Sequence, residues 1–428
     1  MKLTDTPVAQ KEPVQEQIPA EKLAYAIPAS SPTQNSDPNI QFDFNEGCRI
    51  AIVPNGKPWH IRIIDSDTKN VIFENDLEGG MIQSTKRYYV PLQIEAFQEG
   101  KLKFIHTFSA KDRNVLIQLA AGTLGDSLGW LPYAVKFKEK HQCKLTIAIG
   151  APLIPLVKSQ YPDIEFITKM EIKPEKYYAT YYIGLFFDDK DLLYQPYDFR
   201  YVGLHRTAGY ILGVNPDEVP PKVTADPGGP PISRKYVCIA TQSTTQAKYW
   251  NNPLGWRQII HYLTAAGYEV VCIDQAAIRG AGLIWNLIPH GVRDETGDRP
   301  LSERARWLKH CEFFIGLSSG LAWLAWAMNK PIVLISGFTH PTNEFFTPYR
   351  VINTHACNSC WNDPAHKFAH DDAMWCPRHV GTPRQFECTR LITGEQVMAA
   401  INRIPGFTPP PPSWQPRETT IAIADVKR

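Results

Sequence analysis

Two stretches of this 428-residue chain alternate short, continuous apolar runs with amphipathic segments of helical period. Continuous apolar runs are typical of strands buried on both faces of a parallel sheet, and the amphipathic segments between them predict covering helices. Residues 215–231, with six prolines and two glycines, separate the two stretches and have the composition of a linker. The predicted strands lie at 115–120, 144–150, 236–242, 268–274, 312–317 and 331–336. The pattern therefore predicts an α/β protein with two Rossmann-like domains that face each other across a cleft.

The sequence outside these stretches changes character several times. Residues 41–110 hold short β-branched or aromatic runs separated by turn sequences, which predicts a small antiparallel β-domain. Residues 1–40 are rich in Pro, Gln, Ser and Glu and have few large apolar side chains, which predicts disorder. The predicted parts are a disordered extension (1–40), the β-domain (41–110), a first α/β domain (111–214), the linker (215–231), a second α/β domain (232–350), a cysteine-rich finger (351–392), a helix (393–404) and a proline-rich tail (405–428).

Composition narrows the class of protein. The formal net charge is +2 and basic residues are scattered, which argues against a dedicated nucleic-acid binder. No apolar run approaches the roughly 20 residues that a membrane-spanning helix needs. The N-terminus also lacks the apolar core of a secretory signal, so we expect a cytoplasmic protein without a membrane span.

Four of the nine cysteines cluster near the C-terminus. Cys357 and Cys360 form a CxxC pair, which is followed by Cys376 and Cys388. Four thiolates at this compact spacing can surround one metal ion, whereas the alternative is a group of free thiols or a disulfide. An all-cysteine site is closed and therefore structural rather than catalytic. The spacing does not choose between iron and zinc, because both accept four thiolates.

Two glycine-containing turns join a predicted strand to a predicted helix. In the first, Gly122–Ser127, Asp126 lies where the carboxyl ends of parallel strands bind ligands, but this turn taken alone favours the alternative that Asp126 merely caps the following helix. In the second, Gly316–Gly320, Ser318 or Ser319 is a natural N-cap, and the unpaired amides of the next helix turn can bind a phosphate. An ordinary capped turn is the alternative at this second position.

A third polar segment follows the first strand of the second α/β domain. It runs from Thr241 to Lys248 and offers several hydroxyl groups and one ammonium group. These groups suit a diphosphate, and a polar surface loop is the alternative. No DxD pair occurs in these three segments, so the sequence gives no reason to expect a catalytic divalent ion there.

Taken together, these segments resemble one family. Residues 239–260 and 313–338 resemble the nucleotide-sugar domain of heptosyltransferases. The cysteine run 357–389 resembles the iron finger of the bacterial autotransporter heptosyltransferases, and the β-domain and the Gly122–Ser127 turn fit the same family. The resemblance extends over about residues 41–404, and its most specific element is the four-cysteine run directly after the nucleotide domain.

The resemblance implies a GT-B glycosyltransferase with an added small β-barrel-like domain and a four-cysteine metal knuckle. It implies transfer of heptose from ADP-heptose to serine hydroxyls of an autotransporter passenger before export, ferric iron (Fe3+) at the knuckle with zinc as the alternative, and a homo-oligomer, a dodecamer. It makes Asp126 the catalytic base and Cys357, Cys360, Cys376 and Cys388 the metal ligands. The predicted acceptor turn comprises Thr123, Leu124, Gly125 and Ser127, and the predicted nucleotide-sugar residues are Thr241, Ser243, Thr244, Thr245, Lys248, Gly316, Ser318, Ser319, Gly320 and Leu321.

Two other functions are compatible with these sequence features. One is a heptosyltransferase of lipopolysaccharide core assembly, which would share the fold and the donor but would not be expected to carry a four-cysteine finger. The other is a non-catalytic scaffold in which the metal knuckle binds a protein partner. An autotransporter heptosyltransferase and a core-assembly heptosyltransferase differ in the acceptor they use. A scaffold differs from both because it would tolerate the loss of Asp126.

Overall fold

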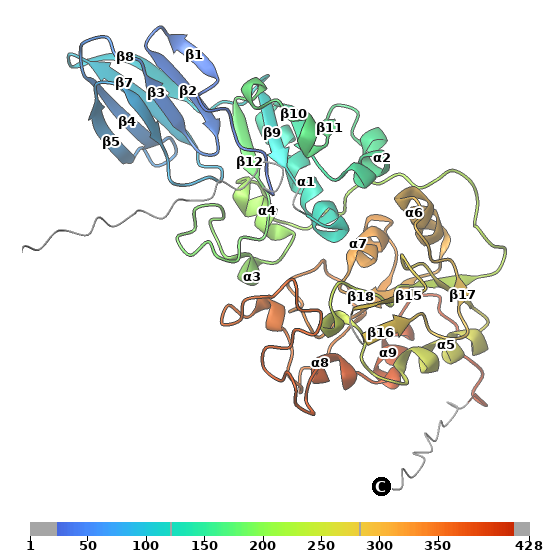
Figure 1. Cartoon of the computed structure of the whole chain (residues 1–428). Helices are drawn as coiled ribbons and strands as arrows, with labels where there is room; N and C mark the ends of the chain where they lie inside the picture. The colour runs from blue at the N-terminus through green and yellow to red at the C-terminus, as the bar shows by residue number, and fades with distance from the viewer. Residues whose placement is uncertain (1–23, 120–121, 282–283, 415–428) are drawn as a thin grey trace, which may run out of the picture.

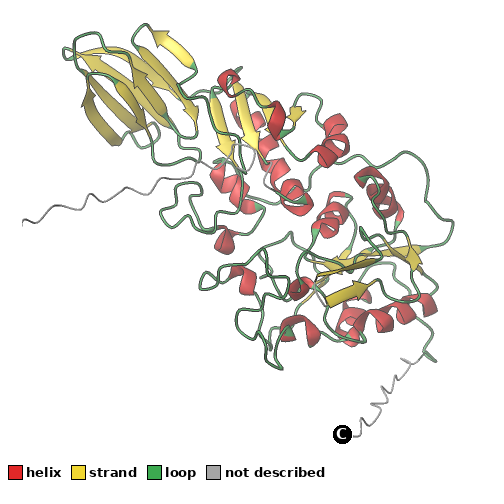
Figure 2. Ribbon diagram, in the orientation of Figure 1, coloured by secondary structure: helices red, strands yellow, loops and turns green. Residues whose placement is uncertain are grey.

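The chain folds into three parts that follow one another in space: a β-domain, a first α/β lobe and a second α/β lobe (Figures 1 and 2). The computed structural model describes residues 24–119, 122–281 and 284–414. No helix within these ranges is both long and apolar enough to cross a membrane.

The β-domain is antiparallel, as the sequence pattern predicts, and consists of two sheets rather than the barrel-like sheet that the resemblance implies. One contains β1 (Gln34–Asp37), β2 (Ile40–Asn45), β3 (Arg49–Ile52) and β6 (Gly80–Gln83); the other has the order β5 (Val71–Leu77), β4 (Trp59–Asp65), β7 (Leu92–Gln98) and β8 (Lys101–Thr107). Their inner faces share one core, in which the rings of Phe42 and Phe104 lie 5.1 Å apart. No strand pair joins the two sheets within the described residues, and β2 pairs in parallel with β12 (Ala179–Tyr182) of the first lobe.

The predicted disorder of residues 1–40 is wrong for residues 24–40. The backbone of Ala26 exchanges two hydrogen bonds of 2.9 and 3.0 Å with the side-chain amide of Gln118, and the hydroxyl of Tyr25 donates to the carbonyl of Ile183 at 2.9 Å. Farther along, β1 pairs with β2. These partners lie far away in the sequence, so the composition of the segment could not reveal them. Residues 1–23 lie outside the described residues.

The first lobe confirms the predicted parallel α/β pattern. Its strands follow the order β11 (Glu165–Ile167), β10 (Lys144–Ala148), β9 (Asn114–Gln118) and β12 (Ala179–Tyr182), all parallel. Its helices are α1 (Leu124–His141), α2 (Ile154–Val157), α3 (Phe199–Val202) and α4 (Arg206–Ile211). Helix α1 begins at Leu124, four residues before the amphipathic period that predicted it, so the Gly122–Ser127 turn is shorter than expected. The early start follows from a capping box between Thr123 and Asp126.

The second lobe repeats this architecture, as predicted. Its parallel strands follow the order β17 (Arg293–Asp294), β14 (Glu269–Cys272), β13 (Tyr236–Ile239), β18 (Phe314–Leu317), β19 (Ile332–Ile335) and β20 (Arg350–Val351). The helices are α5 (Gly255–Ala265), α6 (Leu301–His310), α7 (Gly320–Ala327), α8 (Glu387–Arg390) and α9 (Gly394–Ile401), and β15 (Ile278–Ala281) pairs with β16 (Ile284–Leu287) as a separate hairpin. The cysteine-rich finger lies beside this lobe, next to α3 (Figure 1).

Helices α1 and α7 join the two lobes where their glycines permit a close approach. A Cβ atom at Gly125 would lie 2.6 Å from the Trp323 ring, and one at Gly320 would lie 2.9 Å from the Cβ of Leu124. Gly125 and Gly129 both face Trp323 from α1, one turn apart. These glycines thus allow α1 and α7 to pack closely, and the packing places the first turns of the two helices next to each other.

Gly125→Ala should destabilise the fold by about 1–3 kcal/mol, because the added methyl group overpacks a tight contact. Gly150→Ala is the matched control, since the nearest atom to its Cβ lies 3.8 Å away. Thermal unfolding of the two variants measures the difference. Equal melting temperatures would show that the contact between α1 and α7 tolerates a side chain.

Candidate active site

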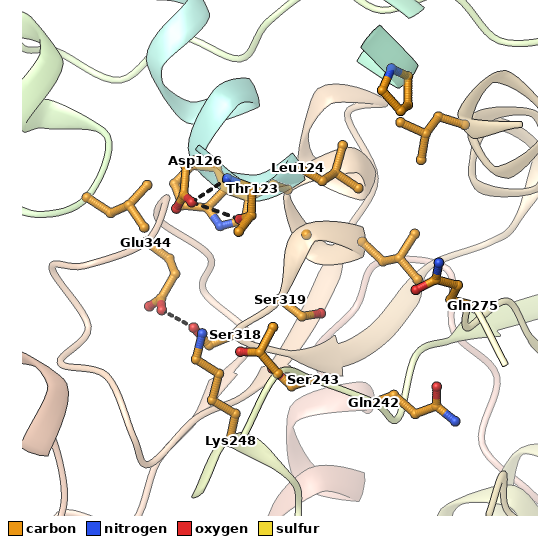
Figure 3. Close-up of a pocket in the computed structure, with 18 of the residues that line it drawn as sticks. Thr123, Leu124, Asp126, Gln242, Ser243, Lys248, Gln275, Ser318, Ser319 and Glu344 are labelled. Atoms are coloured by element: carbon orange, nitrogen blue, oxygen red, sulfur yellow. Dashed lines mark hydrogen bonds between the residues drawn. The ribbon is translucent and has the colours of Figure 1, made fainter. Parts of the chain in front are cut away.

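A cavity of about 1330 Å³ lies between the two lobes and receives side chains from both (Figure 3). The first turn of α1 contributes from the first lobe, whereas the turns after β13 and β18 contribute from the second. Eleven of the predicted site residues line it: Thr123, Leu124, Gly125, Asp126, Ser243, Thr244, Lys248, Ser318, Ser319, Gly320 and Leu321. Three turns that are far apart in the sequence therefore meet at one cavity.

Four predicted site residues do not line this cavity. Ser127 is fully buried in α1, and Gly316 lies within β18, where a Cβ atom would be 2.5 Å from the ring of Phe314. Thr241 and Thr245 are buried as well. For Ser127 the turn of α1 explains this, because the side chain points to another side of the helix than Asp126 does.

The two buried threonines support residues that do border the cavity. Thr241 donates from its backbone nitrogen and its hydroxyl to the Asp274 carboxylate, at 2.7 and 2.9 Å. Thr245 donates its hydroxyl to the carbonyl of Ala373 in the finger, at 3.0 Å. Their contribution is to hold the turn that carries Ser243, Thr244 and Lys248.

Asp126 occupies the third position of α1, at the edge of the cavity. Its Oδ2 accepts hydrogen bonds from the backbone nitrogen and the hydroxyl of Thr123, at 2.7 and 2.8 Å. No hydrogen bond in the described part of the chain uses its Oδ1, so this oxygen is available to another group. The two interpretations of Asp126, as a helix cap and as a residue of the site, are therefore compatible.

Lys248 faces Asp126 from the opposite lobe. The residue ends a short 3₁₀ turn, Gln246–Lys248, and its side chain extends toward Ser318 and Glu344 (Figure 3). Burial lowers the pKa of the ammonium group, whereas the charges of Asp126 and Glu344 raise it by less. Among the described residues no hydrogen bond or ion pair involves the ammonium group, so its donors remain free for a ligand.

The turn after β18 presents hydroxyl and amide groups to the cavity. Ser319 is the N-cap of α7, and its own hydroxyl has no hydrogen-bond partner within the described residues. The first amides of α7 lack partners inside the helix and carry the positive end of its dipole. This turn therefore offers a place for a negatively charged group next to Lys248.

Glu344 is a cavity residue that the sequence analysis missed. Its buried carboxylate accepts a hydrogen bond from the Ser318 hydroxyl and pairs with Arg350 at 3.0 Å. It lies in the long loop after β19, at the same sheet edge as the other site residues. The rule that ligands bind at the carboxyl ends of parallel strands could have pointed to this loop.

The four predicted knuckle cysteines all lie in the finger, but among the described residues their thiols do not form a group with all donor atoms within 4.8 Å of one another. Burial, followed by the charges of Cys360, Cys376 and Cys357, raises the pKa of Cys388 to about 12. Thiolates are ligands that both iron and zinc accept, so the chemistry of these side chains is compatible with a metal ion. The structure adds two further candidate ligands, because the donor atoms of Cys357, His379 and Glu387 lie within 4.8 Å of one another.

Comparison with known proteins decides the family. The N-terminal domain of glycosyltransferase TibC matches residues 38–100, and glycosyltransferase family 9 (heptosyltransferase) matches residues 212–374. The autotransporter heptosyltransferase Aah of Escherichia coli is 50% identical over 387 residues, which are 90% of this chain and 98% of Aah. The chain belongs to the autotransporter heptosyltransferases. The resemblance drawn from the sequence is thereby confirmed.

A solved structure supports the same assignment for the fold of this heptosyltransferase. The crystal structure of TibC, a dodecameric iron-containing heptosyltransferase in complex with ADP-D-β-D-heptose, matches with a TM-score of 0.83 and 48% identity. The match covers 88% of this chain and 98% of the TibC chain. The predicted GT-B architecture with an additional N-terminal β-domain is therefore confirmed.

One relative shows that membership of this family does not guarantee activity. The inactive autotransporter heptosyltransferase BimC of Burkholderia thailandensis is 46% identical over 390 residues, 90% of each chain. Overall similarity thus does not separate an active from an inactive member. Catalysis by this heptosyltransferase depends on the groups that line its cavity.

Proposed function

We propose that this heptosyltransferase transfers heptose from ADP-heptose to serine hydroxyls of an autotransporter passenger, in the cytoplasm before export. One observation carries the proposal: Asp126 from one lobe and Lys248 from the other line the same cavity, next to the first turn of α7. A carboxylate on one side and cationic or amide donors on the other are what transfer from a nucleoside diphosphate sugar to a hydroxyl requires.

In the proposed reaction Asp126 is the general base. A serine hydroxyl is a poor nucleophile at neutral pH and gains from a positioned proton acceptor. The serine oxygen forms a bond to the anomeric carbon while the bond from that carbon to the diphosphate oxygen breaks. ADP leaves with the electron pair, and the serine proton passes to the free Oδ1 of Asp126.

The second lobe stabilises the charge that develops on ADP. The ammonium group of Lys248 provides a point charge, and the amides at Ser319 and Gly320 provide hydrogen-bond donors at the positive end of α7. The hydroxyls of Ser243, Thr244, Ser318 and Ser319 and the residues Leu321, Thr123, Leu124 and Gly125 complete the proposed donor and acceptor surfaces. This part of the proposal rests on their positions around the cavity.

The knuckle is proposed to hold one iron ion, with zinc as the alternative. Its proposed ligands are Cys357, Cys360, Cys376 and Cys388. Bound metal would cross-link the finger. The neighbouring His379 and Glu387 would stand beside Cys357. We also propose a dodecamer, by analogy with TibC at 48% identity.

The acceptor separates the proposed activity from the alternatives. Purified enzyme and ADP-heptose should modify an autotransporter passenger and leave a lipopolysaccharide-core acceptor unchanged. ADP release measured with each acceptor gives the answer. Transfer to the lipid-linked acceptor alone would support a core-assembly enzyme, and the absence of transfer to both would support a scaffold such as an inactive relative.

Lys248→Ala should weaken ADP binding about 10- to 150-fold, because a charge-assisted contact to phosphate contributes roughly 1.5–3 kcal/mol. Calorimetric titration with ADP measures the effect. Lys235→Ala removes the same charge from an exposed position of the second lobe, away from the cavity, and should not change the affinity. Equal ADP affinity of the two variants would remove Lys248 from the donor site.

A further inference from the structure

The cysteine-rich finger forms one wall of the cavity. Trp361, Phe368 and His370 line it, and Trp361 directly follows the metal-site cysteine Cys360 in the chain. The backbone nitrogen of Trp361 donates to the carbonyl of Phe338 at 3.1 Å. The finger and the active site therefore adjoin each other and are not separate parts of the molecule.

An aromatic cluster connects the knuckle to this wall. The ring of Trp361 lies 5.5 Å from that of Phe338 and 4.9 Å from that of Phe368, and Trp375 packs against both phenylalanines. All four side chains are buried, and Cys360 packs against the same cluster. Cys360 of the predicted knuckle thus packs against a cluster that includes Trp361 and Phe368, two rings that line the cavity.

Lys248 lies on the cavity side of this cluster. Its ammonium nitrogen is 5.4 Å from the centre of the Phe338 ring and 5.5 Å from that of Trp361, within the range of cation–π attraction. The backbone before Lys248 is also tied to the finger, because the nitrogen of Gln246 donates to the carbonyl of Ala373 at 2.8 Å. The finger therefore contacts both the side chain of Lys248 and the turn that carries it.

We infer that the finger is a positioning element of the donor site, in which Trp361 and Phe338 hold the Lys248 ammonium group toward the diphosphate. The inference rests on the proposed role of Lys248. Two aromatic faces attract the cation without accepting its hydrogen bonds, so its donors stay free for phosphate oxygens. A carboxylate in the same place would occupy those donors. Trp361 thereby acts on the donor through Lys248.

The experiment is a double-mutant cycle on ADP affinity, measured by calorimetry in the full chain. Trp361→Leu should weaken ADP binding about 3- to 30-fold, whereas Trp361→Phe should restore most of the affinity because it keeps an aromatic face. In the Lys248→Ala background Trp361→Leu should have no further effect. Phe338→Leu, which lies outside the finger, should repeat this pattern even if Trp361→Leu disturbs the fold. Metal content per chain is measured for every variant.

The outcomes separate this inference from the proposed function. If Lys248→Ala leaves ADP affinity unchanged, the proposed role of Lys248 fails. If Lys248→Ala weakens binding but Trp361→Leu and Phe338→Leu do not, only the positioning inference fails. The positioning inference also fails if Trp361→Leu lowers ADP affinity by the same factor in the wild type and in the Lys248→Ala background. The tryptophan would then act independently of the lysine.

Discussion

Asp126→Asn is expected to lower heptose transfer about 10²- to 10⁴-fold, the usual contribution of a positioned base. The amide has nearly the shape of the carboxylate but cannot take the proton of the acceptor serine. Its oxygen can still accept the hydrogen bond that the Thr123 nitrogen donates to the carboxylate. ADP affinity and the melting temperature should therefore stay close to those of the wild type. Single-turnover transfer to a passenger, with ADP titration and thermal unfolding, measures all three.

Asp126→Ala is the matched control for the helix cap. It removes the acceptor of two hydrogen bonds and should lower stability by about 0.5–2 kcal/mol in addition to abolishing transfer. If Asp126 served as a cap alone, Asn would transfer heptose at nearly the wild-type rate, and only Ala would show a defect. That pattern would contradict the assignment of the base.

Cys376→Ser is expected to remove most of the bound metal and to weaken ADP binding toward the level of Lys248→Ala. The loss of one of four thiolates should lower metal affinity by at least about tenfold, since even neighbouring groups contribute that much. From the sequence alone, a closed site of four cysteines predicts that this substitution affects the structure of the protein rather than its ADP binding. The structure adds a route to the donor, because Cys376 packs against the cluster of Trp361 and Phe338 beneath Lys248. Elemental analysis and ADP titration test the two effects separately.

Cys311→Ser is the control for the cysteine substitution. This thiol is buried in the second lobe, and its hydrogen bond to the carbonyl of Leu308 at 3.2 Å suits a serine hydroxyl as well. The Cys311→Ser protein should keep its metal and its ADP affinity. A Cys376→Ser protein that loses its metal but binds ADP normally would separate the finger from the donor site.

The sequence predicted the two α/β lobes well because their strands are fully buried and therefore continuous in apolar residues. The structure brings Asp126, Lys248 and the turn after β18 to one cavity, as expected if the carboxyl ends of parallel strands gather ligand-binding groups. The start of α1 was missed because a capping box, rather than the apolar period, sets it. Local chemistry of this kind competes with periodicity at helix ends.

Other features depend on tertiary contacts that sequence patterns do not carry. Ala26 is ordered by Gln118, which is 92 positions away. Glu344 reaches the cavity from a long loop, and the finger reaches Lys248 through an aromatic cluster whose members are dispersed along the chain. In each case residues far away in the sequence, not the segment's own composition, determine where the segment lies.

The central claim is best tested by the intact mass of an autotransporter passenger coexpressed with this chain. The account predicts that the passenger gains whole heptosyl units on serines, and that Asp126→Asn reduces the gain severely while the variant is produced at the same level. A passenger of unmodified mass beside well-folded, metal-loaded wild-type protein would contradict it.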